Sequence, residues 1–214
     1  MSQRDPGVGL LSADEKVSRN WTPIMQLALP KIGLCEEELL YFRRIKGVDF
    51  SYDATVLAFE QGDELAFDTY FNSVSVGKLK GYCEIPDLCF QIRYSGALRL
   101  TFSLHREGYS DADLLQVALD GTGNTTIPLP FWPALQDGML YVRVRALSDA
   151  VIYETSYGTQ SRPRRDVSLG IVVTTFNRQA QVLAAVRRLD RELLADPDYA
   201  ARVRLVVVDN GRNV

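Results

Sequence analysis

Histidine and cysteine are scarce in this sequence of 214 residues, which contains one histidine and three cysteines. The single histidine, His105, excludes a histidine-rich zinc site, because such a site needs several imidazole ligands. The cysteines form no CxxC pair, and three of them cannot all pair within one chain. We therefore expect reduced cysteines that are buried or half-buried, and a pairing of Cys83 with Cys89 across a turn stays open.

Strong net charge and long apolar runs are also lacking. The formal net charge of -3 argues against general binding to nucleic acid, which needs a strongly basic surface. No apolar stretch approaches the ~20 residues that a membrane helix requires. The first residues, "MSQRDPGVGLLSADEK", have no apolar core of the kind that signal peptides contain. A globular protein in the cytoplasm is the expectation.

Alternation of apolar and polar residues dominates the chain up to about residue 165. Around His105, in "LRLTFSLHREG", leucine and phenylalanine alternate with polar residues, which predicts an exposed strand histidine rather than a catalytic base. Turn signals such as "DGTGN" and "QDG" separate the runs. The alternation predicts strands over residues 56–59, 88–94, 98–106, 114–119, 125–129, 139–146 and 151–156. A short helix is expected over 36–42.

These patterns predict a mainly β sandwich or barrel over residues 21–165, preceded by a flexible arm over 1–20. Its aromatic side chains could stack on sugars, although most are explained as core. They are Phe90, Tyr94, Phe131, Trp132, Tyr141 and Tyr153. The segment "GTQSRPRRDVS" then forms a polar connection, which we interpret as a solvated linker. The alternative is a basic patch that faces an anionic ligand or partner.

Residues 166–214 show a different spacing of apolar residues. Leu169–Thr174 is a continuous apolar run, 179–194 has apolar residues at helical spacing, and Arg204–Asp209 is a second apolar run. They predict an incomplete α/β unit of strand, helix and strand. Such a unit leaves Val206, Val207 and Val208 exposed on at least one face.

The two strands of this unit end in "TTFNR" and "DNGRN". Ligands of open parallel sheets bind at the carboxyl ends of the strands, so both polar clusters are expected at one edge. Phe176 offers a stacking surface, Arg178 a positive charge and Asp209 a carboxylate. The unit contains neither a GxGxxG nor a GxxxxGK[ST] motif, which disfavours a dinucleotide site and excludes a phosphate-loop NTPase.

The ordered pair "IVVTTFNR" and "VVVDNG", with a helix between, resembles the opening of a family 2 glycosyltransferase of the GT-A, Rossmann-like fold. The β-rich region upstream, with "FDTYFNSVSVGKLK", is similar to the N-terminal β-domain of the galactofuranosyltransferases that polymerise cell-wall galactan. The resemblance implies transfer of galactofuranose from UDP-galactofuranose to a polysaccharide acceptor. It implies a donor-binding role for Thr174, Thr175, Phe176, Arg178, Asp209 and Asn210.

Such enzymes also need Mg²⁺ or Mn²⁺ on a later Asp-x-Asp motif and a downstream carboxylate as general base. Neither follows here, so no catalytic or metal-binding residue is assigned, and the 214-residue chain alone is predicted to be inactive. Asp111 and Asp113 have the spacing of the Asp-x-Asp motif, but we interpret them as part of a solvated loop. Alternatives for the site are that Asn177 caps the helix, that Phe176 packs beneath the sheet, and that Asn210-Gly211 is only a turn.

Two other functions compete with the transferase. One is a non-catalytic carbohydrate-binding or assembly module, and the weaker one is an α/β regulator that binds ATP or GTP. Peripheral association with the inner face of the membrane and homo-oligomerisation stay open.

Overall fold

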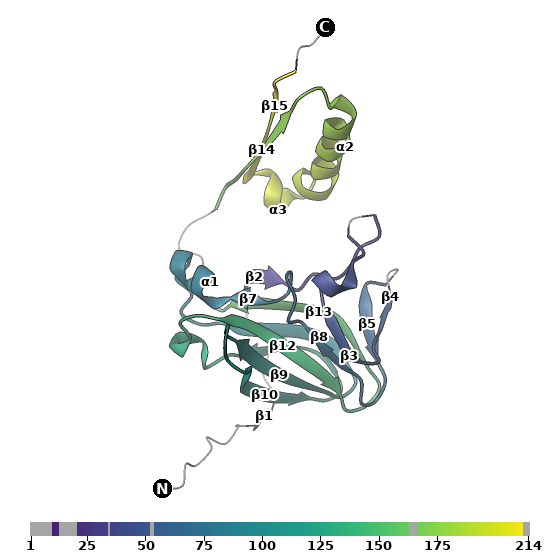
Figure 1. Ribbon diagram of the computed structural model, residues 1–214, viewed down its shortest axis with the longest axis vertical. Helices are drawn as coiled ribbons and strands as arrows, with labels where there is room; N and C mark the ends of the chain where they lie inside the picture. The colour runs from purple at the N-terminus through teal and green to yellow at the C-terminus, as the bar shows by residue number, and fades with distance from the viewer. Residues whose placement is uncertain (1–9, 13–20, 34, 52–53, 163–166, 212–214) are drawn as a thin grey trace. The chain divides into compact units, whose positions relative to one another are not determined.

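A computed structural model describes residues 10–12, 21–33, 35–51, 54–162 and 167–211. The chain divides into two compact units, residues 1–162 and 163–214, and each is considered by itself. Unit 1 is built almost entirely from β-strands, which agrees with the expected β-sandwich, and most of its strands are labelled in Figure 1.

The larger sheet of unit 1 has seven strands among the described residues, in the order β1-β10-β9-β12-β6-β3 with β7 also pairing with β12. All neighbours are antiparallel except β1 and β10. Its strands are β1 (Leu10–Ser12), β3 (Arg43–Lys46), β6 (Glu64–Ala66), β7 (Val74–Ser75), β9 (Leu98–His105), β10 (Ala112–Leu119) and β12 (Met139–Ala146). Residues 10–12 thus form a strand within the segment that we expected to be an arm.

The smaller sheet has six strands among the described residues, in the order β11-β8-β13-β5-β4, and β2 also pairs with β13. All of its pairs are antiparallel. Its strands are β2 (Thr22–Gln26), β4 (Asp49–Ser51), β5 (Val56–Phe59), β8 (Cys89–Ser95), β11 (Thr122–Pro128) and β13 (Ala150–Thr159).

The two sheets pack face to face over one apolar core. Phe90 on β8 meets Phe102 on β9 edge to face, with ring centroids 5.3 Å apart, and also meets Tyr157 on β13 at 5.0 Å. All three side chains are buried, because alternate residues of each strand point inward and the polar ones between them point outward. Burial of Phe90, Tyr94 and Trp132 confirms that these aromatic residues belong to the core.

Short helices connect the strands of unit 1. The helix expected over 36–42 is a three-residue 3-10 turn, η1 (Glu38–Leu40). Helix α1 (Val76–Tyr82) was not expected, and a second 3-10 turn is η2 (Trp132–Ala134). The ammonium group of Lys80 on α1 donates to the carbonyl oxygens of Trp132 and Leu135 at 2.7 and 2.6 Å, which ties α1 to η2.

The three cysteines are free. Cys89 is buried and Cys35 is half-buried, as expected, but Cys83 is exposed because it follows the C-terminus of α1. Burial raises the pKa of the Cys89 thiol to about 11. No helix among the described residues combines the length and the apolar character that crossing a membrane needs.

Unit 2 contains one parallel pair of strands, β14 (Leu169–Thr175) and β15 (Val203–Asp209). Helix α2 (Gln179–Leu189), the π-helical turn η3 (Asp190–Leu194) and helix α3 (Pro197–Ala200) connect them. The strand–helix–strand order agrees with the pattern. The continuous apolar run Leu169–Thr174 is of a kind typical of strands buried on both faces, but the residues of β14 are exposed or half-buried. Val206, Val207 and Val208 are 50%, 44% and 39% exposed, which confirms the expected exposure, because the described sheet is only two strands wide.

Candidate functional site

The carboxyl edge of β14 and β15 holds the residues that the sequence singled out. The strands are parallel and in register, so Thr175 lies opposite Asp209, and the two polar ends are neighbours as expected. A hollow of about 590 Å³ opens beside them. It is lined by Val173, Thr174, Thr175, Phe176, Arg178, Gln181, Val182, Ala185 and Asn210.

Asp209 is exposed and does not line this hollow, and its Oδ1 accepts a hydrogen bond from the backbone N–H of Gly211 at 2.9 Å. Phe176 is 66% exposed, so it does not pack beneath the sheet. The hydroxyl oxygen of Thr175 is buried without a partner among the described residues. The roles of these residues toward a ligand stay predictions.

Asn177 does not cap helix α2. The capping position is Arg178, and no side chain there accepts a hydrogen bond from the helix. Asn177 instead takes a left-handed backbone conformation with φ of 52°, a conformation that asparagine tolerates better than most residues. The capping interpretation is therefore wrong, since the residue makes the turn that precedes the helix.

A second site, which the sequence analysis missed, lies on the outer face of the smaller sheet in unit 1. We call it the Trp21 face. It surrounds a hollow of about 250 Å³ and draws its residues from β2, β8, β11 and β13 and from the residue before β2. The residues are Trp21, Pro23, Gln26, Gln91, Arg93, Asn124, Glu154, Thr155 and Ser156.

Strand register places the polar side chains of this face in rows. Ser156 on β13 lies between Gln26 on β2 and Gln91 on β8, and it is opposite both. Gln91 in turn lies opposite Thr126 on β11. The Gln91 amide nitrogen donates to the Thr126 hydroxyl at 3.4 Å. Neighbouring strands are about 4.8 Å apart, so this row extends across the sheet as a polar strip.

A parallel row carries charge. Glu154 lies opposite Arg93, and Arg93 lies opposite Asn124. The Arg93 guanidinium is 3.4 Å from the Glu154 carboxylate and stands over the ring of Tyr153, 5.0 Å from its centroid. Both charged side chains are more than half exposed, so the pair contributes little to stability and its polar atoms can still bind a ligand.

The indole of Trp21 lines the hollow. It rests on the backbone of Gly158, where an added Cβ atom would lie 2.4 Å from Trp21 Cζ2. The arrangement therefore offers an aromatic surface, amide groups that both donate and accept, one carboxylate and one guanidinium. The predicted strands 88–94 and 151–156 contain Gln91, Arg93, Glu154 and Ser156 at alternate positions, but β2 was not predicted and nothing in the sequence pairs it with β13.

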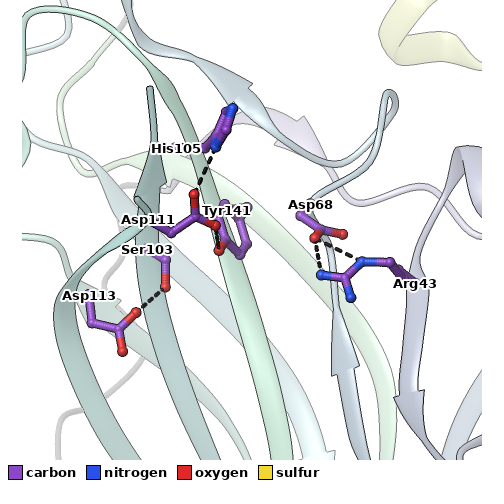
Figure 2. A network of polar contacts seen from close by, with 7 residues as sticks. All are labelled: Arg43, Asp68, Ser103, His105, Asp111, Asp113 and Tyr141. Carbon is purple, nitrogen blue, oxygen red and sulfur yellow. Dashed lines mark hydrogen bonds and ion pairs between the residues drawn. The ribbon is translucent and has the colours of Figure 1, made fainter. Parts of the chain in front are cut away.

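The outer face of the larger sheet carries a third polar group, shown in Figure 2 and called here the Asp111 network. It consists of Ser103, His105, Asp111, Asp113 and Tyr141, which Figure 2 labels, and of Arg143, which the figure does not draw. Asp111 accepts hydrogen bonds from the Tyr141 hydroxyl at 2.5 Å and pairs with Nδ1 of His105 at 2.7 Å. These contacts lower the pKa of Asp111, with the Tyr141 hydrogen bond as the main cause. Burial followed by that hydrogen bond raises the pKa of Tyr141 to about 12.

Asp113 belongs to the same network through other partners. Its Oδ1 accepts from the buried Ser103 hydroxyl at 2.7 Å and from Arg143 at 2.6 Å. The interpretation of Asp111 and Asp113 as a solvated loop holds in part: both side chains are exposed and Asp111 precedes the strand, but Asp113 lies on β10 beside β9. Beside this network, Arg43 and Asp68 form an ion pair, with Nε 3.1 Å from Oδ2.

The Asp111 network does not contain a nucleophile and base pair. Ser103 donates to Asp113 and not to His105. The His105 side chain is 53% exposed, as the alternation predicted for this strand. Among the residues that the structure describes, no group of three histidine, cysteine or acidic residues is placed to hold a metal ion.

Comparison with known proteins finds no matching family model and no matching curated protein. Among solved structures, a carbohydrate-binding module from a Cellvibrio mixtus lichenase in complex with cellotriose shares 12% identity, with a TM-score of 0.34 over 55% of this chain and 89% of that one. A family 29 carbohydrate-binding module complexed with mannohexaose shares 11% identity, with a TM-score of 0.36 over 67% and 97%.

A family 115 4-O-methyl-α-glucuronidase with specificity for decorated arabinogalactans is also similar, with 13% identity and a TM-score of 0.33 over 73% of this chain. The chain spans only 19% of the length of that enzyme. At these low scores the likenesses carry no argument about what this chain binds.

The expectation of a family 2 glycosyltransferase is wrong. The similar solved structures are carbohydrate-binding modules and a glucuronidase, no family model matches, and nothing found points to a GT-A domain. The motifs "TTFNR" and "VVVDNG" are short polar strand ends, and the unit that carries them is a single strand–helix–strand element. The Mg²⁺ or Mn²⁺ of a full-length transferase and the cytoplasmic location stay predictions.

Proposed function

We propose that unit 1 is a non-catalytic carbohydrate-binding module and that the Trp21 face is its glycan site. The observation that carries this proposal is the hollow in which an indole, amide groups, a carboxylate and a guanidinium come together across four strands. A sugar ring presents apolar C–H groups on its face and hydroxyl groups at its rim. The indole suits the face, and side chains that donate and accept suit the rim.

The rows of polar side chains also favour an extended ligand. Gln26, Ser156 and Gln91 follow one another across three adjacent strands, so they can contact successive parts of a polymer. The side chains stand on strands of a packed sandwich, which holds them in place before the ligand arrives. A neutral polysaccharide fits this face, because the one guanidinium of the face, on Arg93, already pairs with its one carboxylate, on Glu154.

Titration calorimetry of the full chain with cellohexaose, mannohexaose and xylohexaose tests this function. We expect binding of at least one of them, and we expect Gln91→Ala and Asn124→Ala each to weaken it about 5- to 10-fold, because each removes a hydrogen bond worth ~1 kcal/mol. Gln160→Ala, an exposed glutamine that does not line the hollow, is the matched control and keeps full affinity.

Two outcomes would contradict the proposal. Failure of all neutral glycans to bind would favour the assembly alternative, in which the sandwich contacts other proteins. Binding that survives both Gln91→Ala and Asn124→Ala would move the site away from the Trp21 face.

A further inference from the structure

Three arginine side chains meet on the outer face of the larger sheet. They surround a hollow of about 220 Å³, which we call the arginine hollow. It is lined by Glu64, Arg99, Thr101, Asp113, Gln116, Arg143 and Arg145. The hollow lies next to the Asp111 network, with which it shares Asp113 and Arg143.

Two of these arginines face each other across the sheet, and Glu64 on β6 lies opposite Arg145 on its other side. Arg99 on β9 lies opposite Arg145 on β12, and neither forms an ion pair with any residue that the structure describes. Like charges directly opposite each other in a sheet destabilise it. A bound anion would relieve this repulsion.

The third arginine is held in a fixed position. Arg143 pairs with Asp113 at 2.6 Å, and Asp113 in turn accepts from the fully buried hydroxyl of Ser103, a contact visible in Figure 2. The Nε atom of Arg143 is buried and has no hydrogen-bond partner among the described residues. A buried donor without a hydrogen-bond partner is unfavourable, so Arg143 is oriented but its hydrogen-bonding capacity is not fully used.

The remaining groups limit what the anion can be. Arginine pairs well with a planar carboxylate, through two parallel hydrogen bonds. The carboxylates of Glu64 and Asp113 line the same hollow and repel a doubly charged phosphate, but they accept hydrogen bonds from hydroxyl groups. Thr101 and Gln116 add groups that both donate and accept.

We propose that the arginine hollow binds the carboxylate and hydroxyl groups of a uronic acid unit in an acidic sugar. Arg99, Arg143 and Arg145 contact the carboxylate, while Glu64 and Gln116 contact the hydroxyl groups. This site lies on a different sheet from the Trp21 face and does not rest on the function proposed for that face.

Titration of the ¹⁵N-labelled full chain by NMR tests this inference with three probes: sodium glucuronate, glucose and glucose 6-sulfate. Glucuronate is expected to shift amide signals of β9 and β12, and glucose is not. Arg99→Gln and Arg145→Gln are each expected to weaken glucuronate binding about tenfold, because each removes a charge-assisted contact. Both side chains are exposed, so the fold should persist, and the amide spectrum checks this.

Arg106→Gln is the matched control, since it removes an exposed arginine that does not line the hollow. Gln91→Ala, which weakens the Trp21 face, should leave glucuronate binding unchanged, so the two sites can fail separately. Equal shifts with glucose and glucuronate, stronger binding of glucose 6-sulfate, or full affinity in Arg99→Gln and Arg145→Gln would each overturn the inference.

Discussion

At the scale of single residues, Asp63 shows how one buried carboxylate can hold two turns. Its Oδ2 accepts hydrogen bonds from the backbone N–H groups of Val48 and Glu60, at 3.0 and 2.9 Å. Gly47 and Val48 both have positive φ angles, of 59° and 69°. Val48 is strained in that conformation, and the Asp63 carboxylate compensates by fixing its N–H group.

The two backbone donors lower the pKa of Asp63 below its usual value. A carboxyl group with a lowered pKa stabilises the fold at a pH above its unfolded value of about 4, and this contribution is lost as the pH falls through the folded value. We expect Asp63→Asn to unfold in less urea than the wild type at pH 7, with a difference that shrinks below pH ~4. Urea titrations from pH 7 to pH 2 measure it.

Asp49→Asn is the control, because Asp49 is exposed, and it should follow the wild type at every pH. An Asp63→Asn curve that runs parallel to the wild type down to pH 2 would show that the backbone hydrogen bonds do not depend on charge.

At the scale of secondary structure elements, the pairing of β2 with β13 forms the Trp21 face. Gly158 is where this pairing is tightest, since an added Cβ atom would lie 2.4 Å from the Trp21 ring and 2.7 Å from the Thr22 carbonyl oxygen. The register also shifts between Tyr157 and Gly158. A bulge of this kind redirects the side chains that follow it.

Gly158→Ala is therefore expected to displace Trp21 and to loosen β2. Overpacking of this kind costs about 1–3 kcal/mol, and the glycan affinity of the Trp21 face should fall with it. Chemical denaturation and calorimetry on the same sample measure both effects.

Gly123→Ala serves as control on β11, because its nearest neighbour, the Thr125 hydroxyl, is 4.0 Å from the added atom. It should change neither stability nor affinity by much. Normal glycan binding by Gly158→Ala would show that Trp21 does not contact the ligand.

At the scale of the whole molecule, the two units differ in how completely they are packed. Unit 1 has two stacked sheets with a continuous core, whereas unit 2 exposes valines on a sheet of two strands among the described residues. The glycan site proposed here lies wholly in unit 1. Its residues, from Trp21 to Ser156, all precede the boundary at Arg162.

A chain that ends at Arg162 is expected to unfold cooperatively at the same temperature as unit 1 in the full chain and to bind glycans with the same affinity. The physical reason is that the core and the Trp21 face are both made from residues of unit 1. Calorimetry and glycan titration compare the two chains. Loss of cooperative unfolding in the shortened chain would show that unit 2 stabilises unit 1.

Much of the β-sheet core could be read from local patterns. The predicted strands 56–59 and 139–146 agree with β5 and β12 to the residue, and the other long strands differ only at their ends. The six short strands β1, β2, β3, β4, β6 and β7 were missed, because two to five residues carry too little periodicity. Helix α1 was missed as well. The strand–helix–strand order of unit 2 was also predicted, but the transferase inferred from its motifs was wrong.

The sequence by itself determined which strand residues point inward and which point outward, because alternation is a property of each strand alone. Only the tertiary structure decided which outward residues meet. Trp21, Gln91 and Asn124 share a hollow, and Arg99 lies opposite Arg145, although they come from distant parts of the chain. The order and register of the strands determine these contacts. Both depend on how distant strands pack together, and a local sequence pattern does not specify that packing.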